Sequence, residues 1–244
     1  MRIRFWSIVT AMLLWATLTN AAAGQPHKTL NVYGPGGPYE ALLECASLFT
    51  QRHGIEVVVI KLLPDMLEKR LLADGDIYFG GAEFMLTDFD RQHPGVIDLA
   101  TTTLLYPRRI GIIVRKGNPL GIRGVEDLSR QGVDLLEVQL ENMGEFLRSP
   151  NRRQGAVRRT VFTGLQGLNA WLAEPELDAW VTYKSWHTAL GSQAEFIEIP
   201  DTQALRYLPI ALTQRTPHRR EALAFITFLQ SDDARRIFTK YGWN

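Results

Sequence analysis

The sequence lacks several features that define common classes of protein. It has one cysteine, so no disulfide can form within the chain. Its 27 basic and 26 acidic residues nearly balance, without the excess positive charge that nucleic acids or anionic membranes attract. No segment after residue 23 approaches the roughly 20 consecutive apolar residues of a membrane-spanning helix. These absences favour a globular protein with no nucleic-acid partner.

Motifs of common enzymes are absent as well. The chain has no Gly-x-Ser-x-Gly elbow and no Ser-x-x-Lys motif. Its histidines are dispersed, without the paired spacing of a zinc-binding helix: His27, His53, His93, His187 and His218. Cys45 shares a helical spacing with Leu42, Ala46 and Phe49, which we interpret as core packing, with a reactive thiol as the alternative. We therefore expect no catalytic residues, no cofactor and no metal site.

The first 23 residues have the organisation of a secretory signal peptide. Arg2 and Arg4 precede an apolar run over residues 5–18, and three alanines follow at 21–23. We predict cleavage after Ala23 and export to the periplasm. The alternative is a membrane anchor, although the apolar run is short for a bilayer. Removal of residues 1–23 takes two arginines away and changes the formal charge from +1 to −1.

The rest of the chain alternates between strand-like and helix-like segments. Helical periodicity occurs over residues 38–52 and 65–73. Short apolar runs rich in β-branched and aromatic residues predict strands at 29–33, 55–61, 76–79, 110–115, 133–139, 160–163, 178–183 and 195–199. This order predicts an α/β protein whose sheets are mixed, mostly parallel, and covered by helices.

Two helices are predicted at the C-terminal end. Thr216 precedes Pro217, which suits the first position of a helix. Ser231 is expected to cap a second helix, with acidic residues in its first turn and Gly242 beyond its end. We interpret both helices as packing elements.

Two glycine-rich loops each join a predicted strand to a predicted helix. Gly36 and Gly37 lie in the first loop, and Gly81 and Ala82 lie in the second. Glycine lets the backbone approach a ligand closely, and a helix N-terminus offers N–H groups and partial positive charge to an anion. Neither loop has the spacing of a dinucleotide-binding or P-loop motif. Both loops could serve structure alone, or they could meet at one crevice and bind an anion there.

Glu83 follows the second loop directly. Its carboxylate could simply favour the positive end of the helix that begins there. Alternatively, it could accept a hydrogen bond from an ammonium or hydroxyl group of a ligand. A carboxylate at the site would repel a doubly charged oxyanion, so the position of Glu83 bears on the identity of the ligand.

Several segments, in one order along nearly the whole chain, have a recognisable pattern. They are Asn31-Val32-Tyr33-Gly34-Pro35-Gly36-Gly37-Pro38, Asp76-Ile77-Tyr78-Phe79-Gly80-Gly81-Ala82-Glu83-Phe84-Met85, Arg115-Lys116-Gly117-Asn118-Pro119, Asp178-Ala179-Trp180 with Trp186, Ala211-Leu212-Thr213-Gln214, Phe228-Leu229-Gln230-Ser231 and Tyr241-Gly242-Trp243. Together these segments resemble the accessory colonization factor family of bacterial extracellular solute-binding proteins, which is related to the periplasmic sulfate- and molybdate-binding proteins.

The resemblance implies a two-lobed periplasmic binding protein fold of type II, with a hinge of two crossovers. One lobe would contain residues 24–108 and 205–244, and the other would contain 109–204. The hinge strands would lie near 108–112 and 203–207. In this arrangement the ligand sits between the lobes.

The resemblance also implies which residues contact the ligand. Backbone groups of the two glycine loops would hold an oxyanion, together with the loop near Gln139. Tyr183 stands where related proteins place a ligand-contacting tyrosine, or it packs on Trp186 as a strand-end side chain. Lys184 could add a positive charge, or it could be a solvent-exposed lysine.

One segment departs from the family pattern. Similar proteins have a Gly-Ala-Gly-Gln-Thr-Gly-like stretch where this chain has bulkier and acidic residues at 139–145. Asn142 could still bind the ligand there. Glu141 and Glu145 would disfavour sulfate if they point inward, whereas they could also lie on the solvent face of the following helix.

The function implied by the resemblance is capture of a small anion, such as sulfate or molybdate, for an ABC permease by a monomeric periplasmic protein. A second hypothesis is a binder or sensor of an amino acid or organic acid that feeds no transporter. An enzyme is the third and remote hypothesis.

Overall fold

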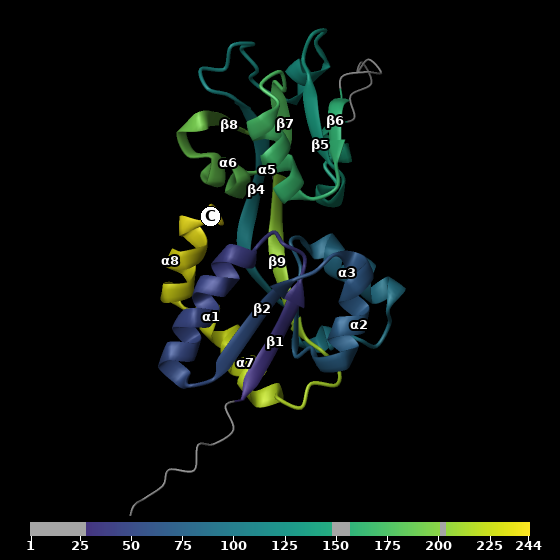
Figure 1. Cartoon of the computed structure of the whole chain (residues 1–244), viewed down its shortest axis with the longest axis vertical. Helices are drawn as coiled ribbons and strands as arrows, with labels where there is room; N and C mark the ends of the chain where they lie inside the picture. Colours follow the sequence, from purple (N-terminus) through teal and green to yellow (C-terminus); the bar gives the residue numbers. More distant parts are fainter. Residues whose placement is uncertain (1–27, 148–156, 201–203) are drawn as a thin grey trace, which may run out of the picture.

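The computed structural model describes residues 28–147, 157–200 and 204–244 (Figure 1). The predicted signal peptide lies outside these residues. The strands are β1 (Thr29–Gly34), β2 (Glu56–Lys61), β3 (Ile77–Phe79), β4 (Thr103–Arg115), β5 (Leu135–Val138), β6 (Val157–Val161), β7 (Ala179–Tyr183), β8 (Ala194–Glu198) and β9 (Leu205–Leu212). The α-helices are α1 (Tyr39–His53), α2 (Pro64–Asp74), α3 (Glu83–Gln92), α4 (Gly144–Leu147), α5 (Gly164–Ala173), α6 (Lys184–Leu190), α7 (Arg219–Phe228) and α8 (Asp232–Lys240). No helix in these ranges combines the length and the hydropathy needed to span a membrane.

The molecule has two halves joined by two long strands. The strand order is β2-β1-β3-β9-β4-β7-β5-β6, and β8 also pairs with β4. The first half contains β1, β2, β3 and helices α1, α2, α3, α7 and α8, whereas the second half contains β5, β6, β7, β8 and helices α4, α5 and α6 (Figure 1). β4 pairs with β9 as far as Arg109 and with β7 and β8 from Ile110 and Gly111 onward. The two halves are therefore connected through β4 and β9.

The sheet is mixed because chain direction reverses at these connecting strands. The pairs β1–β2, β1–β3, β5–β6 and β5–β7 are parallel. The pairs that involve β4 or β9 are antiparallel. The predicted mixed α/β class is confirmed.

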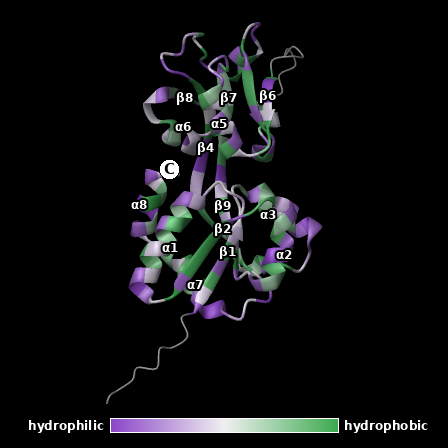
Figure 2. Cartoon of the chain, viewed as in Figure 1, coloured by the Kyte–Doolittle hydropathy of each residue, from purple (hydrophilic) through white to green (hydrophobic). Residues whose placement is uncertain are grey.

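Helices cover both faces of the sheet in the first half. Leu30 and Val32 of β1 point into a core with Phe49 of α1 and Phe225 of α7, whereas Tyr33 points to the opposite face, where α2 and α3 pack. This alternation follows from the two-residue period of a strand. Figure 2 shows the apolar residues concentrated on these strands and the polar residues on the outer faces of the helices. The second half is covered in the same way by two further clusters, one of which contains Trp171 and Trp180.

Most predicted elements are present, with two informative differences. β4 begins at Thr103 rather than at 110. Pro107 interrupts the apolar pattern that predicts a strand, and the pairing of β4 with β9 accommodates it by a shift of register between Leu104 and Pro107. The prediction of Pro217 at the first helical position is wrong. α7 begins at Arg219, and the Thr216 hydroxyl instead accepts a hydrogen bond from the His218 N–H at 3.1 Å.

The second C-terminal helix agrees with its predicted cap. The Ser231 hydroxyl accepts a hydrogen bond from the Ala234 N–H at 3.3 Å, as an N-cap does. After α8 the chain turns back toward the second half (Figure 1). A Cβ placed on Gly242 would lie 2.4 Å from Thr188 Oγ1 and 2.9 Å from Ser185 Cα, both on α6. The C-terminal segment of the first half thus packs directly on the second half.

Candidate functional site

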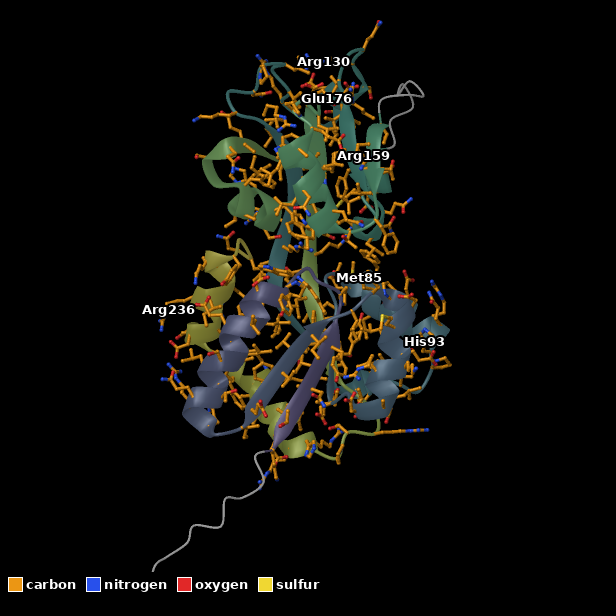
Figure 3. All side chains as sticks on the ribbon, viewed as in Figure 1. Met85, His93, Arg130, Arg159, Glu176 and Arg236 are labelled. Carbon is orange, nitrogen blue, oxygen red and sulfur yellow. The ribbon has the colours of Figure 1, made fainter. Side chains whose placement is uncertain are left out.

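A cleft of about 380 Å³ lies between the two halves. This volume falls within the range of about 300–1,000 Å³ typical of small-molecule sites. Figure 3 shows Met85, one of its lining residues, at the edge of the first half that faces the second. The first half and its connecting strand contribute Pro35, Gly36, Gly37, Glu40, Ala41, Lys61, Leu62, Leu63, Gly81, Met85, Arg108, Tyr241 and Trp243. The second half contributes Leu140, Glu141, Thr163, Gly164, Leu165, Ser185, Trp186 and Ala189.

Arg108 of β4 is the buried cation of this cleft. Arg108 is only 2% exposed. The central carbon of its guanidinium lies 3.6 Å from the centre of the Tyr183 ring and 4.9 Å from the centre of the Trp243 ring. The Nε group donates a hydrogen bond to Ser185 Oγ at 3.1 Å. Nη2 has no hydrogen-bond partner within the described residues. Burial lowers the pKa of Arg108 from its usual value, although a guanidinium stays charged at physiological pH.

The two glycine loops bring their backbones next to this guanidinium. A Cβ on Gly37 would lie 3.0 Å from Arg108 Nη1, and one on Gly81 would lie 3.7 Å from the same atom. Gly37 also precedes the N-terminus of α1, a helix of 15 residues whose positive end faces the same region. The combination of a buried cation, a helix N-terminus and close backbone is chemically suited to hold an anion.

Glu141 is the buried anion on the opposite wall. It is 5% exposed and ends a short 3-10 helix, Gln139–Glu141. Its Oε2 accepts a hydrogen bond from Thr182 Oγ1 at 2.5 Å, and its Oε1 accepts one from Trp186 Nε1 at 2.6 Å. Burial raises the pKa of Glu141, and the charge of Arg108 opposes that rise. The alternative in which Glu141 lies on a solvent face is therefore wrong, whereas Glu145 is exposed and pairs with Arg206.

Large apolar side chains form much of the remaining wall. Leu62 and Leu63 come from the segment between β2 and α2, whereas Leu165 and Trp186 come from the second half. Trp186 can lie against the start of α5 because Gly164 has no side chain. A Cβ there would lie 2.3 Å from the indole ring.

The structure brings three of the predicted site residues together in the cleft. Gly36, Gly37 and Gly81 all line it. Ala82 is fully buried beside them and does not line the cleft. Glu83 lies in a second hollow, one of its oxygens buried with no hydrogen-bond partner in the described part of the chain.

The other predicted residues occupy different places. Asn142 has a left-handed backbone with φ of 50° and lines the second hollow together with Glu83. Tyr183 is completely buried beneath Arg108, and Lys184 begins α6 without lining the cleft. Gln139 is exposed and also lies outside the cleft lining.

Sequence reasoning missed the two buried charges that line the cleft, Arg108 and Glu141. The family resemblance places Arg108 only at the edge of a hinge strand, and the sequence leaves two orientations open for Glu141. The local sequence gives no signal for the burial of Arg108, because its neighbour Arg109 on the same strand is exposed. In the described residues, no group of three or more His, Cys, Asp or Glu side chains could hold a metal ion.

Comparisons with known proteins relate the chain to exported binding proteins. The family model described as bacterial extracellular solute-binding protein matches residues 30–244. YvgL of Bacillus subtilis (strain 168), named as a candidate ABC transporter substrate-binding lipoprotein, is 33% identical over 69 residues, which cover 28% of this chain and 26% of YvgL.

Solved structures share the fold. L-phospholactate-bound PEB3, a protein of Campylobacter jejuni, has a TM-score of 0.70 at 24% identity, covering 88% of this chain and 99% of PEB3. The sulfate-binding protein SubI from Mycobacterium tuberculosis H37Rv has a TM-score of 0.72 at 15% identity, covering 89% of this chain and 86% of SubI. These similarities confirm the two-lobed type II periplasmic binding protein fold. By the match over residues 30–244, the chain belongs to the bacterial extracellular solute-binding protein family.

Proposed function

We propose that this protein captures a small anionic ligand between its two halves and presents it to an ABC importer. The observation that carries the proposal is Arg108, a buried cation in the cleft with Nη2 unpartnered among the described residues. A buried charge is unfavourable unless it is paired, so a ligand oxyanion at Nη2 would compensate the guanidinium. Gly37 and Gly81 would let that oxyanion approach the backbone.

Binding would act by favouring a closed arrangement of two lobes. We propose residues 24–108 with 205–244 as one lobe and 109–204 as the other, turning about β4 and β9. A ligand that contacts Arg108 from one side and the second half from the other has a higher affinity for the closed form. Closure by differential affinity needs no covalent step, so the proposal includes no enzymatic activity.

Two relatives support the transport part of the proposal. YvgL carries the name of an ABC transporter substrate-binding lipoprotein, and SubI that of a sulfate-binding protein. We therefore propose a periplasmic monomer, exported by the sequence at 1–23, that docks with a membrane permease. The structure of PEB3, which has the same fold, contains bound L-phospholactate and so supports an organic anion as the ligand.

A second candidate is an organic acid as the ligand, in a binder or sensor without a transporter. The apolar walls and the inward carboxylate of Glu141 favour an organic acid over sulfate or molybdate. They do not distinguish transport from sensing, which the presence of a cognate permease would decide.

The proposal is tested by a thermal-shift screen of refolded, ligand-free protein. The panel contains sulfate, molybdate, tungstate, phosphate, amino acids and organic acids. A ligand at about 100 times its dissociation constant adds roughly 2.7 kcal/mol and raises Tm by several degrees.

Arg108→Met should abolish the shift seen with any anion. The matched control is Arg109→Met, which changes an exposed arginine next to it on the same strand. An anion-induced shift that survives in Arg108→Met, or no shift with any anion in wild type, would contradict the proposal.

A further inference from the structure

We infer that the ligand is an organic monoanion with an apolar body, and that Glu141 is the residue that selects against dianions. The inference rests on the proposed function and goes beyond it by naming the class of ligand. It combines the charges of the cleft with the chemistry of its walls.

The cleft contains one buried charge of each sign. Arg108 and Glu141 both line it, and each is at most 5% exposed. One ligand oxyanion can approach the guanidinium, the glycine loops and the N-terminus of α1. A second negative charge would lie close to the Glu141 carboxylate in a medium of low dielectric constant, where repulsion between like charges is strong. Lys61 and Glu40 also line the cleft, but both are exposed to solvent and their formal charges cancel. The two buried charges therefore favour a ligand with a single negative charge.

The Glu141 carboxylate is also fixed in place. Each of its oxygens accepts a hydrogen bond, one from Thr182 on β7 and the other from Trp186 on α6. Rotation away from an incoming dianion would break both bonds and leave their donors unpaired, which is unfavourable for buried groups. The Glu141 carboxylate therefore stays in place and repels a second negative charge on the ligand, because side-chain movement cannot relieve the repulsion.

The walls fit an apolar body rather than an inorganic ion. Leu63 and Leu165 line the cleft from opposite halves and remain 46% and 47% exposed, and Leu62, Leu140 and Trp186 also line it. A tetrahedral oxyanion has no apolar surface to bury against these side chains. An organic anion would cover them and gain the hydrophobic contribution of that burial. Its apolar part would contact both halves at once and so stabilise closure.

The test is isothermal titration calorimetry of the ligand-stripped protein with acetate, hexanoate, phenylacetate, sulfate, molybdate and the neutral analogue phenylacetamide. We expect phenylacetate and hexanoate to bind about tenfold or more tightly than acetate, sulfate and phenylacetamide. Glu141→Gln keeps the side-chain shape and removes the charge. It should move the affinity ratio of sulfate to phenylacetate about tenfold toward sulfate.

Leucine variants test the apolar walls independently. Leu165→Ala should weaken binding of phenylacetate about fivefold and leave the weak binding of acetate unchanged. The matched control is Leu172→Ala, which removes a comparably exposed leucine (52%) from the same helix, outside the cleft.

The outcomes separate this inference from the proposed function. Tight binding of sulfate or molybdate that depends on Arg108, with no advantage for the apolar acids, overturns the inference and leaves anion capture standing. Failure of every carboxylate, or equal effects of Leu165→Ala and Leu172→Ala, also overturns it. Tight binding of phenylacetamide, unchanged by Arg108→Met, would overturn both.

Discussion

The guanidinium of Arg108 stacks on the ring of Tyr183, with 3.6 Å between its central carbon and the ring centroid. Both residues are buried where the two halves meet. Burial raises the pKa of the Tyr183 phenol, so the ring stays neutral at physiological pH. The tyrosine predicted to touch the ligand thus supports the cation that we propose to bind it.

Tyr183→Phe distinguishes these two roles of the tyrosine. Its hydroxyl is buried without a hydrogen-bond partner in the described ranges, and such a group costs about 1–3 kcal/mol. We expect the phenylalanine variant to unfold at the same or a higher temperature and to bind the ligand with unchanged affinity, because the stacking is retained. Calorimetry and thermal melting measure both quantities. A loss of affinity of tenfold or more would instead mean that the hydroxyl contacts the ligand.

Gly37→Ala tests the close approach of the first glycine loop to Arg108. The added methyl would lie 3.0 Å from Nη1 and would push the guanidinium out of position, so anion affinity should fall about tenfold. Gly36→Ala is the matched control, since its methyl would make only an ordinary 3.5 Å contact with the Lys61 side chain. Titration of both variants with the same anion makes the comparison, and equal affinities would argue against the assignment of Gly37.

Gly242→Ala tests the contact between the C-terminal segment and α6. The methyl group would overlap Thr188 and force the halves apart, so the radius of gyration in solution scattering should rise and ligand affinity should fall. The left-handed backbone at Gly242 (φ 80°) adds a cost of about 1–2 kcal/mol for alanine. Gly54→Ala isolates this cost, because Gly54 also has a left-handed backbone (φ 66°) but no atom near its Cβ position. Identical scattering from the two variants would contradict the prediction.

Glu141 should make stability depend on pH. Because burial raises the pKa of Glu141 in the folded protein above its ordinary 4.5, the folded state holds this proton to a higher pH than the unfolded state does. Ionisation therefore opposes folding, and stability falls as pH rises from 4.5 through the folded pKa. Glu141→Gln removes this dependence, so its Tm relative to wild type should increase as pH rises from 4.5 through the folded pKa. A Tm difference between Glu141→Gln and wild type that does not change with pH would contradict the prediction.

Cys45 should be unreactive in the folded protein. It is fully buried on α1, and burial raises the pKa of its thiol to about 12, so almost no thiolate is present at neutral pH. A thiol reagent at pH 8 should label the protein only at the rate of unfolding. In denaturant the same reagent should label one thiol per chain, and rapid labelling without denaturant would contradict the prediction.

Local patterns in the sequence were sufficient to predict elements whose buried residues recur at the regular spacing of a helix or a strand. The spacing of Leu42, Cys45, Ala46 and Phe49 predicted α1, and each of these side chains is buried there. The start of β4 was missed because Pro107 and the two arginines after it do not fit the pattern of a strand. This part of β4 is held by its pairing with β9. The predicted lobe boundaries and ligand contacts stay predictions.

The central charges could not be found from local patterns because distant residues determine their burial. Arg108 is covered by Tyr183 and Trp243, which lie far along the chain. Glu141 turns inward because Thr182 and Trp186 offer it hydrogen bonds. Neither arrangement leaves a signature in the residues on either side of the charge.

The positions of the tryptophans give the protein an optical reporter of its own. Trp171 and Trp180 are enclosed in the core of the second half, whereas Trp186 and Trp243 line the cleft. The indole of Trp186 is hydrogen-bonded to a carboxylate, and that of Trp243 lies beside a guanidinium, so a ligand entering the cleft changes the field and the hydration around both rings. Intrinsic fluorescence of unlabelled protein should therefore follow ligand capture in real time. Trp171 provides a constant background, whereas Trp180 stacks on Trp186 with 6.2 Å between the ring centroids and is coupled to it.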